Sequence, residues 1–178
     1  MVGNDVIDIE QTKKHSNWER VGFVEKVFNN EEQKIIIESL NPFNTVWRMW
    51  SMKESAYKIQ LQHDGVRSFY PTKIGCKIIS SENGLVCIGK TKINTHTITN
   101  DKYIFTYASI NDLASIENSV FYLMNKSPLL QSKQTHQKIL QYISSKNQLE
   151  LNQLSIKKTS ANIPQFFYKK QKLTFLFH

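Results

Sequence analysis

The sequence predicts an α+β fold in which one long helix packs across a twisted, mostly antiparallel sheet. Three observations lead to this class. An alternating segment opens the chain at residues 2–9, a helical region ends in a long helix at 42–62, and strand-like segments then follow over residues 72–110. Helices and strands that occur in separate runs are typical of α+β proteins rather than of parallel βαβ folds.

The first 40 residues are predicted to form one strand and two helices. Residues 2–9 alternate with the period of two that marks a half-buried strand. Residues 18–28 and 30–40 have the apolar spacing of amphipathic helices. The second helix begins with Glu31 and Glu32, which the helix dipole favours in a first turn.

The helix at 42–62 is expected to be buried on most of its circumference. Asn41 is a suitable N-cap, and Pro42 is tolerated in a first helical turn. At about 100° per residue, one narrow side of the helix holds Trp47, Ser51, Glu54 and Lys58. A carboxylate and an amine here are costly to desolvate unless they meet each other, a metal ion or a charged ligand. The alternative is an ordinary solvated pair between Glu54 and Lys58, one helical turn apart.

Strand signals dominate the segment that follows. Residues 62–71 read as a loop because they contain Asp64-Gly65 and Pro71. The strand candidates are residues 72–80, 85–93 and 103–110. Between the first two, Glu82-Asn83-Gly84 predicts a hairpin turn.

The last third of the chain gives weaker signals. We assign residues 112–128 only loosely, to a short helix or an edge segment, and predict a helix at 132–146. Short strands are expected at 154–157 and 173–177, with a turn at Ile163-Pro164 between them. Because no low-complexity linker divides the chain, we expect residues 1–178 to form one domain or two unequal halves, 1–110 and 111–178.

The formal net charge of +8 is unevenly distributed. Residues 1–125 hold equal numbers of basic and acidic residues, whereas residues 126–178 hold nine lysines and a single acid, Glu150. Such asymmetry suits an anionic partner, either nucleic acid, a polyphosphate ligand or an acidic protein. The competing interpretation is a lysine-rich surface that reflects only biased codon usage.

Several protein classes are disfavoured by the sequence. No segment resembles a membrane span, and the N-terminus lacks the charged region and apolar run of a signal peptide. We therefore expect a cytoplasmic protein with no membrane association. Cys76 and Cys87 lack the spacing of zinc ligands and are expected to be free thiols in strands.

Three short motifs occur in order near the start of the chain. They are Gly3-Asn4-Asp5-Val6-Ile7-Asp8-Ile9-Glu10, Phe28-Asn29-Asn30-Glu31-Glu32 and Trp50-Ser51-Met52-Lys53-Glu54-Ser55-Ala56-Tyr57-Lys58. Together they resemble the G-x-D-x-x-E/D, F-x-x-x-E and W/F-x-x-K-E-x-x-x-K motifs of the 4'-phosphopantetheinyl transferase superfamily. The resemblance covers residues 1 to about 80 and points to the holo-acyl-carrier-protein synthase type.

This resemblance implies a transferase that moves the phosphopantetheine arm of coenzyme A onto a serine of an apo-acyl or peptidyl carrier protein and releases adenosine 3',5'-bisphosphate. Such a reaction needs a divalent cation at the diphosphate, a base for the serine and a positive group for the leaving phosphate. The resemblance places Mg²⁺ on Asp5 and Glu54, because hard oxygen ligands suit this ion. It gives catalytic roles to Glu54 and Lys58, with Lys58 at the leaving phosphate.

Two further coenzyme A contacts follow from the resemblance. Lys53 is expected to contact the diphosphate, the alternative being a lysine that extends along an apolar helix to reach solvent. His178 is the candidate for a nucleotide contact, as in the family's terminal strand, the alternative being an incidental histidine, because its strand departs from the family's usual ending. The family's pattern also continues past this strand, so the coenzyme-binding half is expected to be incomplete or shortened here.

Asp8 can be placed in two ways. A regular strand points residues i and i+3 to opposite faces, so Asp5 and Asp8 cannot both reach one metal ion without a bulge or a strand end. If Gly3 starts the motif, Asp5 is the first ligand and Asp8 a peripheral acid. If the motif is Ile7-Asp8-Ile9-Glu10, Asp8 and Glu10 share a face and are the ligands. We favour the first register because it retains the glycine.

Two other functions compete with the transferase. One is a nucleic-acid-binding module, which requires aromatic residues among the lysines of the basic third on an exposed sheet face. Only Phe166-Phe167-Tyr168-Lys169-Lys170 approaches this pattern, so no nucleic-acid partner is expected. The other is an inactive relative that binds a carrier protein without modifying it. The oligomeric state is left open.

Overall fold

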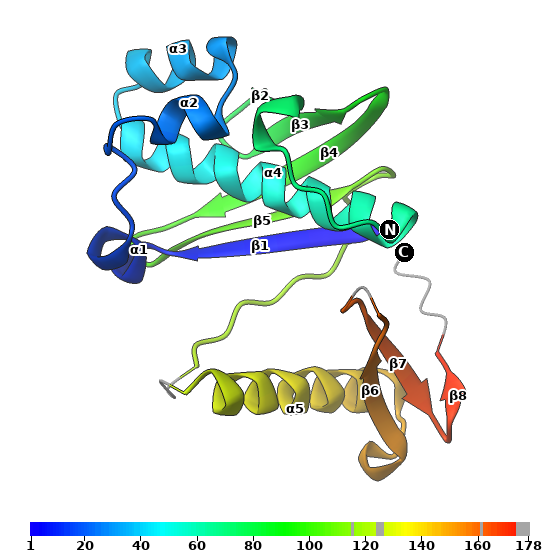
Figure 1. Ribbon diagram of the computed structural model, residues 1–178. Coiled ribbons are helices and arrows are strands. Elements are labelled where there is room, and N and C mark those ends of the chain that lie inside the picture. The colour runs from blue at the N-terminus through cyan, green and yellow to red at the C-terminus, as the bar shows by residue number, and fades with distance from the viewer. Residues whose placement is uncertain (115, 124–126, 161, 174–178) are drawn as a thin grey trace. The chain divides into compact units, whose positions relative to one another are not determined.

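The computed structural model describes residues 1–114, 116–123, 127–160 and 162–173 (Figure 1). The chain divides into two compact units, unit 1 over Met1–Ser115 and unit 2 over Ile116–His178.

Unit 1 is built on a five-stranded sheet. Its strands are β1 (Val2–Asp8), β2 (Ile74–Ile78), β3 (Asn83–Ile88), β4 (Thr91–Thr99) and β5 (Tyr103–Ser109). They lie in the order β1-β5-β4-β3-β2, and every neighbouring pair is antiparallel. The predicted α+β class and the antiparallel sheet are confirmed.

Helix α4 (Pro42–Asp64) lies across one face of this sheet and contacts β1 and β5 most extensively. As predicted, Asn41 caps its first turn by accepting a hydrogen bond from the Asn44 N–H at 3.1 Å. Gly65 ends the helix in the left-handed conformation, with φ of 68°, which glycine adopts readily. Its core-facing side chains include Val46, Met49, Met52, Ala56 and Ile59, which are almost completely buried.

Helix α4 packs closely against β1 at Gly3. A Cβ atom at Gly3 would lie 2.0 Å from the carbonyl oxygen of Ser55, so any larger residue would push the helix away from the strand. The Ser55 hydroxyl also donates a hydrogen bond to the carbonyl of Thr106 at 3.0 Å, which joins α4 to β5. This close packing fixes the side chains of β1 relative to those of α4.

Three shorter helices complete unit 1: α1 (Ile9–His15), α2 (Phe23–Val27) and α3 (Asn30–Glu38). Helix α1 was not predicted from the sequence. Asp8 starts it by accepting a hydrogen bond from the Gln11 N–H at 2.9 Å. The helix expected at 18–28 was too long, because Gly22, with φ of 80°, marks a later start for α2. In Figure 1, α2 and α3 lie beside the N-terminal half of α4.

One strand prediction was wrong. Residues 85–93 were expected to form a single strand, but Gly89 has φ of 58° and the chain turns there, so β3 ends at Ile88 and β4 begins at Thr91. The strand expected to start at residue 72 starts instead after a 3-10 turn at Pro71–Lys73. The first turn lies at a glycine and the second opens with a proline, Pro71.

The described residues of unit 2 form the helix α5 (Pro128–Asn147), a 3-10 turn at Leu151–Gln153 and three strands. The strands β6 (Leu154–Lys158), β7 (Pro164–Tyr168) and β8 (Gln171–Lys172) form an antiparallel sheet in that order. Helix α5 contacts β6, and Ile143 on α5 and Leu154 on β6 are both buried.

The predictions for unit 2 were partly wrong. The turn expected at Ile163-Pro164 lies slightly earlier in the chain, because Pro164 already belongs to β7 and Ile163 hydrogen-bonds to Thr159, just after β6. Proline is compatible with the first position of a strand. Most of the strand expected at 173–177 lies outside the described residues, and Leu173 itself is not in a strand. None of the helices in the described ranges has both the length and the apolar character needed to span a membrane.

Candidate functional site

Asp5, Glu54 and Lys58 come together where β1 passes along α4. Asp5 lies on the same face of β1 as Gly3, which touches the helix, and Glu54 and Lys58 are one helical turn apart on α4. The Lys58 Nζ atom lies 3.2 Å from Asp5 Oδ1 and also donates a hydrogen bond to the carbonyl of Asn4 at 2.6 Å. The structure thus unites three of the residues that the motifs singled out.

The Asp5 carboxylate is only half satisfied. Its side chain is 17% exposed, against 42% for Lys58. The Oδ1 atom faces Lys58, whereas Oδ2 is buried and has no hydrogen-bond partner in the described part of the chain. Leaving a buried carboxylate oxygen unpaired is costly, so this atom marks a position where a ligand would be stabilised.

Glu54 is held in an environment that disfavours its negative charge. Burial raises the pKa of the Glu54 carboxyl above its ordinary value, and repulsion from Asp5 raises it further, while Lys58 opposes the shift. The single ammonium group of Lys58 therefore interacts with two carboxylates, those of Asp5 and Glu54. A perturbed carboxyl next to a charged partner is typical of functional sites, although structural networks also produce such shifts.

The residues present fit a Mg²⁺ ion bound jointly with substrate. Among the described residues, no group of three or more His, Cys, Asp and Glu side chains could hold a metal. Mg²⁺ does not need such a cage, since it is commonly bound through one or two carboxylates with water and substrate phosphates completing its shell. The unpaired Asp5 Oδ2 and the charge-disfavoured Glu54 are the two oxygen donors that this arrangement would use.

Asp8 and Glu10 lie away from this cluster. Asp8 is exposed and caps α1, and Glu10 is exposed on α1, where it pairs with Lys14 at 2.5 Å. Strand alternation accounts for this, because Asp8 leaves β1 on the face opposite to Asp5. The geometry corresponds to the register in which Gly3 starts the motif, with Asp8 as a helix cap.

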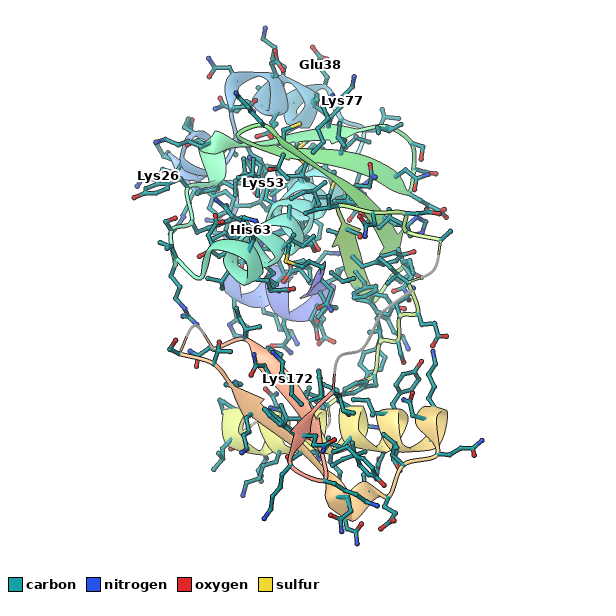
Figure 2. The ribbon with its side chains drawn as sticks, turned by 90° about the vertical axis from the view of Figure 1, so that its right-hand side faces the viewer. Lys26, Glu38, Lys53, His63, Lys77 and Lys172 are labelled. Atoms are coloured by element: carbon teal, nitrogen blue, oxygen red, sulfur yellow. The ribbon has the colours of Figure 1, made fainter. Side chains whose placement is uncertain are left out.

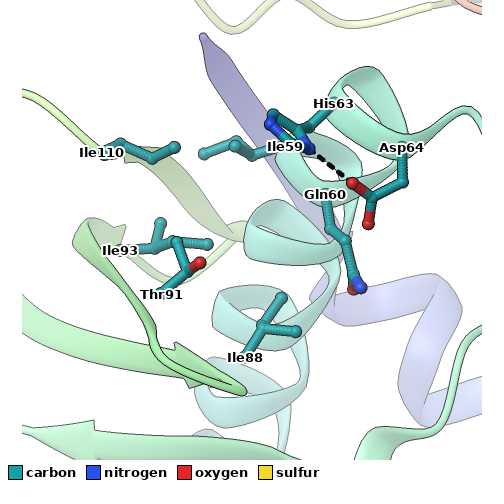
Figure 3. Close-up of a pocket in the computed structure, with 8 residues that line it drawn as sticks. All are labelled: Ile59, Gln60, His63, Asp64, Ile88, Thr91, Ile93 and Ile110. Atoms are coloured by element: carbon teal, nitrogen blue, oxygen red, sulfur yellow. Dashed lines mark hydrogen bonds and ion pairs between the residues drawn. The ribbon is translucent and has the colours of Figure 1, made fainter.

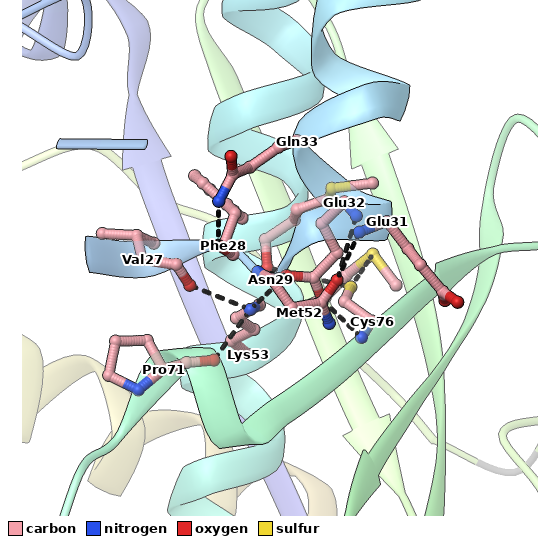
Figure 4. Close-up of polar contacts among 11 residues, drawn as sticks. Val27, Phe28, Asn29, Glu31, Glu32, Gln33, Met52, Lys53, Pro71 and Cys76 are labelled. Atoms are coloured by element: carbon pink, nitrogen blue, oxygen red, sulfur yellow. Dashed lines mark hydrogen bonds and ion pairs between the residues drawn. The ribbon is translucent and has the colours of Figure 1, made fainter. Parts of the chain in front are cut away.

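Lys53 occupies a different place from the one expected. Its side chain is completely buried, and its Nζ atom donates three hydrogen bonds, to Glu32 Oε2 at 2.6 Å and to the carbonyls of Val27 and Pro71 at 3.0 and 2.8 Å (Figure 4). An ammonium has three donors, so this set satisfies all of them. The expected contact with a diphosphate is therefore replaced by a role inside the fold.

Glu32 was expected only at a helix start, and its buried partnership with Lys53 was not predicted. It is the glutamate of the F-x-x-x-E motif that begins at Phe28, and its side chain is 1% exposed. Its Oε2 atom accepts hydrogen bonds from Lys53 and from the Asn29 N–H, and Oε1 accepts one from the Cys76 N–H at 2.7 Å. Glu32 and Lys53 thus join α3, α4 and β2. The F-x-x-x-E spacing was the sequence signal that could have identified Glu32.

A separate pocket of about 290 Å³ lies on another flank of α4 (Figure 3). Its lining combines apolar and polar residues: Ile59, Gln60, His63, Asp64, Ile88, Thr91, Ile93 and Ile110. At about 100° per residue, Ile59, Gln60 and His63 point away from the side of α4 that carries Glu54 and Lys58. This pocket is therefore not the carboxylate site. His178, the other expected contact, lies outside the described residues.

Comparison with known protein families identifies the family of this chain. The model of the 4'-phosphopantetheinyl transferase superfamily matches residues 1–111. The chain belongs to this superfamily. The matched segment contains all of β1–β5 and α4, so Asp5, Glu54 and Lys58 lie in the part that is shared with other superfamily members.

Solved structures of holo-[acyl-carrier-protein] synthases are similar to this superfamily member. The Thermotoga maritima enzyme is 15% identical with a TM-score of 0.46, and the match covers 60% of each chain. The Helicobacter pylori enzyme, solved in complex with coenzyme A, is 14% identical with a TM-score of 0.48, covering 61% of this chain and 97% of that one. The Neisseria meningitidis enzyme is 15% identical with a TM-score of 0.47, covering 60% and 94%. A search of curated proteins finds no match.

Proposed function

We propose that the protein is a Mg²⁺-dependent transferase that moves the 4'-phosphopantetheine arm of coenzyme A onto a serine of an apo-carrier protein. The observation that carries this proposal is the Asp5 carboxylate, whose buried Oδ2 has no partner in the described ranges while Glu54 and Lys58 lie beside it. Membership of the superfamily supplies the reaction class.

In the proposed reaction, the serine oxygen of the carrier forms a bond to the phosphorus that bears pantetheine. The bond from this phosphorus to the bridging oxygen breaks, and adenosine 3',5'-bisphosphate leaves with the electron pair. The serine must also lose its proton. Lys58, whose ammonium is partly exposed, is the group that would stabilise the negative charge on the departing phosphate.

Asp5 and Glu54 would hold the Mg²⁺ ion, which neutralises diphosphate charge when bound. For Glu54 a second role is open. A carboxylate with a raised pKa is a better proton acceptor at neutral pH, so Glu54 could instead take the serine proton. A Mg²⁺ titration of Glu54→Gln separates the roles, since loss of a ligand is partly overcome by excess metal and loss of a base is not.

The test is incubation of the full chain with coenzyme A, Mg²⁺ and several apo-carriers, followed by intact-mass analysis of each carrier. We expect at least one carrier to gain the mass of a phosphopantetheine group in a Mg²⁺-dependent manner, with Glu54→Gln as the matched control. A carrier that binds without gaining mass would indicate an inactive relative and would contradict the transferase assignment.

A further inference from the structure

Unit 2 holds almost all of the net charge of the protein. Residues 116–178 contain nine lysines and two acids, Glu117 and Glu150, while residues 1–115 are close to neutral. Glu117 is engaged by Lys146 and Tyr142 beside α5, and Glu150 lies 3.9 Å from Lys169. Within the described ranges, no carboxylate lies at ion-pair distance from Lys157, Lys158, Lys170 or Lys172.

The strand register of unit 2 gathers part of this charge on one side of the sheet. Ser155 pairs with Phe167, Lys157 pairs with Gln165, and Phe167 pairs with Lys172 across the three strands. Paired residues of antiparallel strands point to the same face, so these five form one surface, which we call the lysine face. Leu154 alternates to the opposite face and is buried, which places that opposite face toward α5. Lys172 is labelled on β8 in Figure 2.

The turn beside this surface adds a second, independent feature. Lys169 and Lys170 connect β7 to β8 with φ of 47° and 66°, both in the left-handed region. Two-residue turns of this kind strongly prefer asparagine and glycine, because a Cβ atom is strained at positive φ. Two lysines here carry a conformational cost and place two more ammonium groups at the end of the hairpin. Residues in such strained backbone conformations are often found at functional sites.

We propose that the lysine face, together with the Lys169-Lys170 turn, docks an acidic protein surface. This inference rests on the proposed function to the extent that the expected acidic partner is the apo-carrier. Unit 2 lies beyond the segment that the superfamily model matches, so this surface would be an addition by this chain to the shared unit.

The aromatic content favours a protein over single-stranded nucleic acid as the partner. Binding of single strands requires several exposed rings on which successive bases stack. The lysine face carries one ring, Phe167, and the Lys157 Nζ atom lies 5.1 Å from its centroid. By strand alternation Phe166 and Tyr168 point to the other face. The surface therefore offers charge and hydrogen-bond donors rather than a stacking platform.

Docking through exposed charges has a defined kinetic signature. Such charges act mainly on the encounter rate, through a field that is screened over about 8 Å at physiological ionic strength. Raising the salt concentration should thus raise the apparent KM for carrier, with a smaller effect on the KM for coenzyme A. Coenzyme A would be held near Asp5, Glu54 and Lys58 at closer range, where screening is weaker.

The test compares two double variants of the full chain. Lys157→Glu/Lys172→Glu reverses two charges on the lysine face, and Lys133→Glu/Lys138→Glu makes the same change in total charge on α5. The readouts are the KM for carrier, the KM for coenzyme A, and equilibrium binding of apo-carrier without coenzyme A. We expect the first variant to raise the carrier KM by about tenfold or more, as loss of electrostatic steering does, and the second to change it little.

Charge reversal of acidic residues on the carrier should restore its binding to the lysine-face variant. Such rescue would not occur if the variant had lost binding because unit 2 was unfolded. Equal carrier KM values for the two variants would overturn the inference. So would a lysine-face variant that loses only the binding of a single-stranded oligonucleotide. A wild-type chain that binds apo-carrier through this face without transferring phosphopantetheine would support the inference and contradict the proposed function alone.

Discussion

The Lys58 ammonium lies 3.2 Å from Asp5 Oδ1 and joins the middle of the first strand to the long helix. The two side chains are unequal, because the Asp5 carboxylate is largely buried and Lys58 reaches solvent. Glu54, one turn before Lys58, has a raised pKa in part because Asp5 is close. The site therefore carries more negative charge than Lys58 neutralises, which is the condition under which a bound cation is stabilising.

The first prediction concerns Glu54→Gln. This change removes the charge of Glu54 while keeping its shape, so transfer should fall by a factor of about 10² or more, as is common when one such group is lost. The measurement is the rate of carrier modification by intact mass, with thermal unfolding to confirm that the variant is folded. Near-wild-type turnover in a folded variant would refute the role of Glu54.

The same variant should be more stable than the wild type at neutral pH. Because burial and Asp5 raise the pKa of Glu54 above 4.5, the folded state binds this proton more tightly than the unfolded state does. The wild type therefore loses stability as pH rises from below about 4.5 through the raised pKa, and Glu54→Gln does not. Thermal unfolding across pH should show a gap in Tm that closes in acid. Added Mg²⁺ should raise the Tm of the wild type more than that of the variant.

Gly3→Ala tests the contact that sets the site geometry. The new Cβ atom would fall 2.0 Å from the Ser55 carbonyl oxygen, so α4 must move away from β1. We expect a loss of about 1–3 kcal/mol in the free energy of unfolding, as for other overpacked sites, with loss of transfer. Gly75→Ala is the matched control, because its Cβ would meet nothing closer than 4.0 Å. Urea unfolding of both variants checks this, and equal stabilities would count against the close packing.

Lys53→Met tests the buried pair. The change leaves the Glu32 carboxylate buried without its partner, which typically costs about 3–5 kcal/mol. The double variant Glu32→Gln/Lys53→Met removes both charges and should recover much of that loss. Chemical unfolding measures both. If Lys53→Met proved as stable as the wild type but failed to bind coenzyme A, the original expectation of a diphosphate contact would be restored.

Local signals in the sequence predicted a large part of the fold. Asn41 and Pro42 marked the start of α4 because capping chemistry is local to a few residues. Strand alternation alone separated Asp5 from Asp8, because that argument needs only the period of a strand. The helix α1 was missed because Asp8, which caps it, also continues the alternation of β1.

The place of Lys53 could not be predicted in the same way. The sequence left open a diphosphate contact or a lysine that reaches solvent, and neither describes its completely buried position. The burial of Lys53 depends on its three hydrogen-bond acceptors, Glu32 and the carbonyls of Val27 and Pro71. Only tertiary packing brings these groups to the Lys53 ammonium. The boundary between β3 and β4 depended on one glycine with positive φ inside an otherwise strand-like run.

The most direct test of the Asp5 site is a Mg²⁺ titration of phosphopantetheine transfer by the wild type, Asp5→Asn and Asp8→Asn. Asp5 carries the buried, unpaired oxygen beside Glu54, whereas Asp8 caps α1 on the opposite face of β1. Our account predicts that Asp5→Asn sharply raises the Mg²⁺ concentration needed for half-maximal transfer and that Asp8→Asn changes it only slightly. The reverse ranking, or equal Mg²⁺ requirements for all three proteins, would contradict the assignment of the site to Asp5 and Glu54.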